Sequence, residues 1–246
     1  MRAGALAGFA AVMAISADAS GPNATRHGVR ADVPWTVGET LEYRVSFGPF
    51  HVGTARLLVI EMDTIRGEPC YQVQFTIHAH ALFYTLDDSM RSWFGASDLV
   101  SRRFAQNTND NGTLRAHRYE IFPERRMWIR DEQDSAGTVP EPLDDASFFF
   151  FARTLPYEDE QTYILPRYFL ADRNPITIRV LGRQSIRVPA GRFGAVVVRP
   201  IFKTGGIFGE GGEATIWFSD DSTRIPLRIR ASMVLGTLDI SLRSRN

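Results

Sequence analysis

The chain has a single cysteine, Cys70, among its 246 residues. One cysteine excludes an internal disulfide framework and any cysteine-rich zinc or iron–sulfur site. Cys70 follows the turn residues Gly67-Glu68-Pro69 and precedes an apolar run. This setting predicts a half-buried structural thiol rather than a nucleophile.

The chain also lacks net charge, because 28 Lys and Arg residues balance 28 Asp and Glu residues. A protein that binds nucleic acid usually carries a basic surplus, so the balance argues against nucleic acid as a partner. With 44% hydrophobic and 23% charged residues, the chain is too apolar for a disordered protein and too polar for a helical membrane protein.

Motifs of catalysis are missing as well. The glycine-rich stretch 205–212 lacks the Gly-Lys-Ser/Thr ending of a phosphate loop. It predicts a hairpin loop whose apolar tip is Ile207-Phe208. No Gly-x-Ser-x-Gly elbow occurs in the sequence. We therefore expect that the protein is not an enzyme, and that it has no catalytic residue and no cofactor.

Two small clusters have the residue types of a chemical site. His78-x-His80 places two imidazoles on one face of a strand, as in some zinc and copper sites, but no third ligand is near in sequence. We expect surface histidines and no metal. Asp220-Asp221 with Arg224 forms an acid pair beside a cation, for which we favour a β-turn with Asx hydrogen bonds. A hydrolase that uses these aspartates or histidines is a third alternative for the function.

The one long apolar run lies at the N-terminus. Met1-Arg2 precedes an uncharged run over 3–15, and Ala17-Asp18-Ala19 has the small residues of a cleavage site. This pattern predicts a signal peptide over residues 1–19, cleaved after Ala19, and a periplasmic location. A membrane anchor is the weaker alternative, because the run is shorter than the roughly 20 apolar residues that span a bilayer.

Apolar and polar residues alternate through most of the remaining chain, which is typical of strands with one buried face. Asn111-Gly112 is a strong hairpin signal between two such runs. About a dozen short strands predict an antiparallel meander rather than βαβ units. We expect a flexible leader over residues 20–35 and a single β domain over 36–243. The clearest alternating runs are at residues 40–47, 71–81, 214–219, 225–230 and 234–242.

One segment breaks the alternation. Asp144-Asp145-Ala146-Ser147 supplies the N-cap and first turn of a helix, which continues from Phe148 to Leu155 and stops at Pro156. Phenylalanine occupies all four positions from 148 to 151. Four consecutive phenylalanines cover every side of a helix, so it must be buried nearly all round or lie across an apolar opening.

Together these elements predict a mostly β fold, with one strongly curved antiparallel sheet or open barrel and a short helix as plug or lid. The alternative is a two-layer β-sandwich whose inner faces fill each other. A barrel of more than about 8 strands has room inside for a ligand. The candidate wall and lid of such a cavity are Tyr43, Phe75, Phe148, Phe149, Phe151 and Ile216.

Several segments, in this order and spacing, resemble the DUF3108 family of exported bacterial proteins. The opening of that family is similar to residues 39–48 and 51–55, and its mid-chain helix to residues 144–156. Its strand–turn–strand resembles residues 188–193, and its closing hairpin resembles residues 216–226. The resemblance spans about residues 36–243. It implies a cell-envelope protein and supplies no catalytic residues.

We expect a non-catalytic binding or carrier protein of the periplasm or cell envelope, with a lipid, acyl chain or other apolar ligand. The open barrels of periplasmic lipoprotein carriers are an analogy at the level of the fold alone. The alternative is a structural or protein-interaction module of the envelope without a ligand cavity, which would contact a protein partner. An outer-membrane barrel would also alternate, but the chain ends without an aromatic residue, and we expect a protein that is not transmembrane.

Overall fold

The structure is a computed structural model that describes residues 33–81, 84–110, 112–201, 214–233 and 236–246. The predicted signal peptide, most of the predicted leader and the glycine-rich stretch 205–212 lie outside the described residues.

Fourteen strands form one antiparallel sheet in the described part of the chain. One α-helix, α1 (Asp145–Arg153), and two 3₁₀ turns, η1 (Pro123–Arg125) and η2 (Ala171–Arg173), complete the described secondary structure. The strands are β1 (Thr40–Phe47), β2 (Phe50–Ile65), β3 (Glu68–Ala81), β4 (Tyr84–Gly95), β5 (Ser101–Asp110), β6 (Thr113–Phe122), β7 (Met127–Arg130), β8 (Asp134–Gly137), β9 (Thr162–Leu165), β10 (Ile176–Val188), β11 (Gly191–Ile201), β12 (Ala214–Ser219), β13 (Pro226–Met233) and β14 (Gly236–Arg245).

Strands that follow one another in the chain are paired in the sheet, apart from β8 and β9. In addition, β1 pairs with β14, which joins the two halves of the chain. The strands β8 and β9 do not pair with each other and form the two edges of the sheet. The prediction of a single antiparallel sheet with one helix is therefore confirmed, and the two-sheet sandwich is not what forms.

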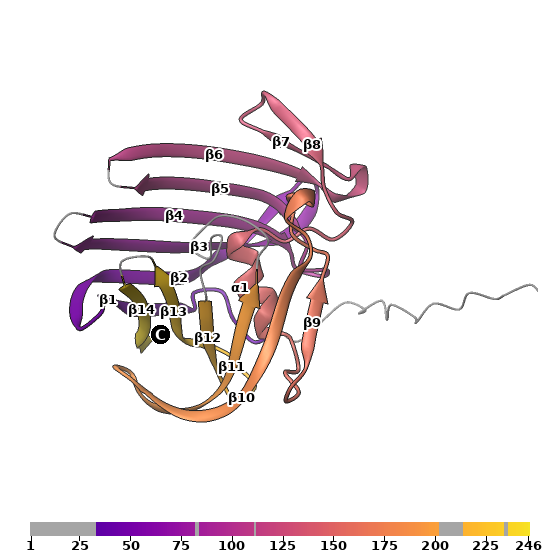
Figure 1. Cartoon of the computed structure of the whole chain (residues 1–246). Coiled ribbons are helices and arrows are strands. Elements are labelled where there is room, and N and C mark those ends of the chain that lie inside the picture. Colours follow the sequence, from indigo (N-terminus) through magenta and orange to yellow (C-terminus); the bar gives the residue numbers. More distant parts are fainter. Residues whose placement is uncertain (1–32, 82–83, 111, 202–213, 234–235) are drawn as a thin grey trace, which may run out of the picture.

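The sheet curls around α1. Figure 1 shows β3 to β6 on one side of the molecule and β9 to β12 curving below, with α1 between them. Sheets of this size twist and coil, so a long meander brings its two ends toward each other. The chain between β8 and β9, which contains α1, passes through the space that this curvature encloses.

The period-two pattern decides which side chains face α1. In β1, Leu41, Tyr43 and Val45 are buried, while Glu42 and Arg44 are exposed. The predicted hairpin also forms, because β5 and β6 pair across Gly112, although Asn111 lies outside the described residues. Inner-face residues from the whole sheet join one hydrophobic cluster, among them Leu57, Val73, Ile77, Met90, Phe104, Ile121, Val180, Val198, Ile229 and Ile240.

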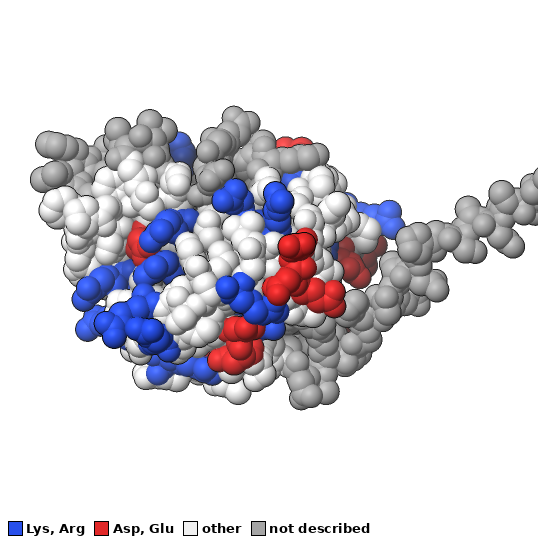
Figure 2. All heavy atoms as spheres, turned by 60° about the horizontal axis from the view of Figure 1, so that its bottom comes forward, with Lys and Arg blue, Asp and Glu red and all other residues white. Residues whose placement is uncertain are grey.

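The outer face of the sheet is polar. Figure 2 shows the lower side of the molecule, where arginines gather on one half and carboxylates on the other. On β13 the guanidinium of Arg230 binds Asp239 of β14 at 3.0 Å. The guanidiniums of Arg228 and Arg230 also lie 5.9 and 5.6 Å from the ring of Trp217 on β12. Arginine thus covers the large aromatic side chain that β12 presents outward.

Two residues are buried more deeply than their sequence setting predicts. Trp35 is the last residue of the predicted leader over residues 20–35. It is 4% exposed and belongs to the core cluster. Cys70, predicted to be half-buried, is fully buried, and its thiol donates to the carbonyl oxygen of Glu68 at 3.4 Å. The packed domain therefore begins at or before Trp35.

Replacing Gly53 by alanine should strongly destabilise the fold. Gly53 lies on β2, and a Cβ there would stand 1.9 Å from the carbonyl oxygen of His78 and 2.7 Å from Cα of Ala79. The backbone of β3 cannot move aside without breaking the sheet, so we expect a loss of about 2 kcal/mol or more in unfolding free energy, measured by urea denaturation. Gly137→Ala is the matched control, because its Cβ would lie 3.8 Å from the Arg126 oxygen. Equal losses in the two variants would contradict the register of β2 and β3.

Candidate functional site

The interior of the sheet is occupied by α1. Phe148, Phe149 and Phe150 are all buried. The Phe149 ring stacks against Phe75 of β3 with centroids 6.0 Å apart, and the Phe150 ring lies 5.1 Å from Trp35. The sequence prediction that a helix with four phenylalanines must be surrounded by apolar groups is met by this arrangement.

The six predicted site residues are brought together. Five of them are buried in one hydrophobic cluster, and Phe151 is partly buried against it. In this conformation their surfaces are covered by other side chains of the protein. Their role as the wall and lid of a ligand cavity stays a prediction. The five buried residues are Tyr43, Phe75, Phe148, Phe149 and Ile216.

Tyr43 and Phe151 each have a polar contact as well. The phenol of Tyr43 donates to the carbonyl oxygen of Pro226 at 3.0 Å, and burial raises the pKa of Tyr43. The guanidinium of Arg167 lies 4.4 Å from the centre of the Phe151 ring. These contacts hold both aromatic groups in place, and neither supplies an ionised group for catalysis.

Asp144 fixes the N-terminal end of α1. Its carboxylate accepts hydrogen bonds from the amides of Ala146 and Ser147, at 3.0 and 2.9 Å, and from the hydroxyl of Ser92 at 2.6 Å. The Ser147 hydroxyl in turn accepts from the Asp144 amide, which completes a capping box. Burial raises the pKa of Asp144 to about 6, although the hydrogen bonds from Ser147 and Ser92 oppose the shift.

Arg153 fixes the C-terminal end of α1. Its side chain is fully buried and forms a two-point ion pair with Glu39, at 2.5 and 3.1 Å. The same guanidinium donates to the carbonyl oxygens of Thr223, at 3.1 Å, and Pro34, at 2.6 Å. A buried ion pair is favourable only when its other donors also find partners, and these two carbonyl oxygens accept from two further N–H groups of Arg153. Arg153 therefore ties α1 to the start of β1 and to the β12–β13 turn.

A cleft of about 600 Å³ opens beside this ion pair. Its volume lies in the range of small-molecule sites. None of the six predicted site residues lines it. No local pattern could have predicted this cleft, because its residues come from distant parts of the chain. The lining includes Trp35, Glu39, Arg153, Leu155, Arg224 and Arg245.

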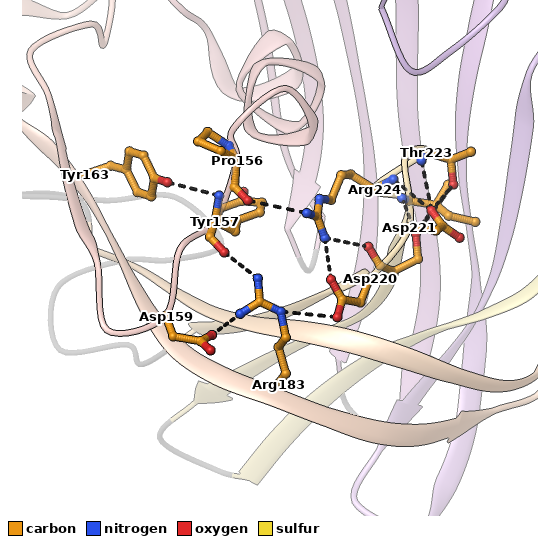
Figure 3. A network of polar contacts seen from close by, with 11 residues as sticks. Pro156, Tyr157, Asp159, Tyr163, Arg183, Asp220, Asp221, Thr223 and Arg224 are labelled. Atoms are coloured by element: carbon orange, nitrogen blue, oxygen red, sulfur yellow. Dashed lines mark hydrogen bonds and ion pairs between the residues drawn. The ribbon is translucent and has the colours of Figure 1, made fainter.

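The predicted acid pair is part of a structural network (Figure 3). Asp221 accepts hydrogen bonds from the Thr223 amide and the Ser219 hydroxyl, both at 2.9 Å, which is the predicted Asx-type turn. Asp220 instead binds two arginines, Arg224 at 2.8 Å and Arg183 at 3.2 Å.

The same network holds the chain that follows α1. Arg183 of β10 donates to the carbonyl oxygen of Tyr157 at 2.7 Å and also pairs with Asp159. The Tyr157 amide donates to the hydroxyl of Tyr163 on β9 at 3.0 Å. All of these carboxylates are engaged by arginines or turn amides, so the network supports the fold.

The predicted surface histidines are confirmed in position. His78 and His80 are exposed on β3. His78 contacts Asp87, and His80 lies 3.3 Å from the Thr85 hydroxyl. No group of three His, Cys, Asp or Glu side chains with metal-binding geometry occurs among the residues that the structure describes.

Comparison with protein families identifies one match. The family model "Protein of unknown function (DUF3108)" covers residues 42–243, most of the chain. The chain belongs to this family. The resemblance stated from the sequence is therefore confirmed. The comparison with curated proteins found no match.

Solved structures support the fold of this DUF3108 protein. A β-barrel-like protein of the DUF1849 domain from Brucella abortus aligns with a TM-score of 0.55 and 11% identity, over 85% of this chain and 97% of that chain. A "putative lipoprotein" from Parabacteroides distasonis aligns at 11% identity over 87% of this chain and 97% of that chain, but its TM-score of 0.37 is too low to support an argument. In the described part of the DUF3108 chain, no helix has the length and hydrophobicity to cross a membrane.

Replacing Glu39 by glutamine should lower the free energy of unfolding of the protein. The substitution leaves the fully buried Arg153 guanidinium without a counter-charge, which costs about 3 kcal/mol of unfolding free energy. Glu42→Gln is the matched control, because Glu42 lies three residues further along, on β1, and is exposed. Chemical denaturation of both variants measures the difference. Equal stability of the two would show that Arg153 does not depend on Glu39.

Replacing Asp144 by asparagine should change the pH dependence of stability. The folded protein holds the Asp144 proton up to about pH 6, above the ordinary pKa of 3.8. The contribution of Asp144 to the unfolding free energy therefore falls as pH rises from about 4 through about 6, and becomes constant about one pH unit above the folded-state pKa. Asparagine still caps the helix but does not titrate.

We expect the stability of Asp144→Asn relative to the native protein to rise by about 2 kcal/mol across that pH interval. Urea denaturation at closely spaced pH values measures the difference, in which the titration of all other groups cancels. A difference that does not change between these pH values would contradict the raised pKa.

Proposed function

We propose that this DUF3108 protein is a non-catalytic binding or carrier protein of the bacterial cell envelope, and that it takes up an acyl chain or another apolar ligand inside the curved sheet. The observation that carries the proposal is the apolar inner face, which is covered by phenylalanines of a short helix instead of by a second sheet. The envelope location follows from the predicted signal peptide at residues 1–19.

The ligand replaces α1 against the inner face. Among the described residues, no backbone hydrogen bond joins Asp145–Arg153 to a strand. Since α1 lies on the connection between the two edge strands β8 and β9, it can leave the interior without breaking any strand pairing. The apolar area lost from the phenylalanines is then regained by contacts with the acyl chain.

The two polar anchors set the cost of that exchange. Asp144 and Arg153 are both buried, and each binds groups on the sheet or its turns. Displacing α1 exposes at least one of them to water, where the charge is again solvated. A ligand must therefore bind the inner face strongly enough to offset the free energy lost when α1 is displaced from it.

Replacing Phe149 by alanine should increase the affinity for an acyl ligand. The variant removes the ring that stacks on Phe75, so less apolar contact has to be displaced, and we expect roughly tenfold tighter binding of a fluorescent fatty acid, equivalent to about 1.4 kcal/mol. Phe218→Ala is the matched control, because Phe218 is a buried phenylalanine on β12 that stacks on Tyr157 at 5.5 Å. It loses a similar ring whose stacking partner, Tyr157, lies outside α1.

Hydrogen exchange provides a second readout. When the fatty acid binds, amides of Asp145–Arg153 should exchange faster, whereas the amides of β3 and β4 should not. Mass spectrometry of the protein purified from cells would show which lipids it carries. A protein that carries no lipid, and whose two alanine variants bind fatty acid equally weakly, would contradict the proposal.

The alternative, a structural or protein-interaction module without a ligand cavity, is supported by one observation. The described interior is filled by the protein's own side chains, including Phe148 and Phe149. That module would show no change in the hydrogen exchange of α1 with any fatty acid, so the same experiment separates the two functions.

A further inference from the structure

Of the three arginines that line the cleft, Arg245 has the most exposed side chain. Its side chain is 42% exposed, and its Nη2 lies 3.6 Å from Oε2 of Glu39. The Arg245 side chain forms no hydrogen bond with any described residue and has only this long contact with Glu39. A guanidinium has five N–H donors in a planar fork, which matches the two oxygens of a carboxylate or phosphate.

The other charged groups of the cleft are already engaged. Every nitrogen of the Arg153 guanidinium donates to Glu39, Thr223 or Pro34. Arg224 binds Asp220 at 2.8 Å. Because Arg153 contacts both oxygens of Glu39, the charge of that carboxylate is neutralised and does not repel an anion at Arg245.

Trp35 connects the cleft to the interior of the sheet. Its ring lines the cleft and also lies 5.1 Å from Phe150 and 6.1 Å from Phe94. Its indole nitrogen is buried and has no hydrogen-bond partner among the described residues. Leu155, directly after the C-cap of α1, adds an apolar surface. The cleft thus has a cationic rim and an apolar wall that leads to the phenylalanines.

We propose that this cleft binds the singly charged anionic head group, carboxylate or phosphate, of the ligand whose acyl chain enters the sheet, and that Arg245 is the residue that contacts it. This inference rests on the proposed function and assigns the ligand class as an anionic amphiphile. The head group takes the place of the long Arg245–Glu39 contact. The chain then extends past Trp35 into the space that α1 occupies.

The experiment compares dodecanoate with dodecanol, which have the same chain but differ in charge. Binding of both is measured by competition against a fluorescent acyl probe at about pH 8, where the carboxylate is ionised. The variant is Arg245→Gln. Its fold should be intact, because an exposed ion pair contributes little stability. Arg243→Gln is the matched control, because Arg243 is exposed on the same strand and does not line the cleft.

We expect Arg245→Gln to weaken dodecanoate about tenfold, the usual effect of losing a charged hydrogen bond, and to leave dodecanol unchanged. Arg243→Gln should change neither. An equal effect on both ligands, or none on dodecanoate, would overturn the inference while the proposed function stands. If the native protein binds neither ligand, the proposed function itself fails. Acetate that competes as strongly as dodecanoate would show a site for free anions and would also overturn the inference.

Discussion

Water must be kept from the inner face of a large curved sheet, and in this protein a nine-residue helix does so. The inner face of the sheet is an almost continuous apolar surface. The side chains of the strands alone do not fill the space that the curvature of the sheet encloses. Phe148, Phe149 and Phe150 fill this space from α1. Without them the inner face would lose much of its packing, since burial of apolar surface is the dominant favourable contribution to folding. The packing of α1 therefore contributes to the stability of the domain, and in the proposed function its position also sets access to the interior.

The connectivity of the sheet makes α1 separable from the strands. In the described part of the chain, thirteen strand pairings connect β8 to β9 through the whole sheet. The outer edges of β8 and β9 are not paired with another strand. The helix belongs to the connection between these two strands and is held by its side chains. Its strongest links are the hydrogen bonds of Asp144 and the ion pair of Arg153 with Glu39. Such links specify one position for the helix, because a buried charge that leaves its partner must be solvated again. In the proposed function, α1 has two positions, one packed against the inner face and one displaced by the ligand. Its two polar anchors would have to separate from their partners between the two.

The cleft beside Arg153 and the filled interior are neighbours that share Trp35. An amphiphile bound across both would place its charge at the rim, where Arg245 is solvated, and its chain among aromatic rings. The Asp220–Arg183 network shares Arg224 with the cleft and holds the chain that leaves α1. Carboxylates there serve the fold, and this explains why acidic residues that resemble a catalytic pair in the sequence have no unengaged partner in the structure.

Local patterns were enough to predict a mostly β chain with several of its strands, the helix and the family. Alternation in residues 40–47 predicts β1 with its buried face, and Asp144 with Ser147 predicts the start of α1, because both signals depend on neighbours in sequence. The resemblance to DUF3108 likewise follows from motifs in a fixed order. Sequence could not show that Glu39 pairs with Arg153, that Trp35 is buried, or that Arg245 stands at a cleft. Glu39 and Arg153 lie 114 positions apart in the chain, and Arg245 lies near Glu39 because β14 pairs with β1. The tertiary structure also decided that the interior is filled, since the number of strands fixes how much space a sheet can enclose but not which side chains occupy it.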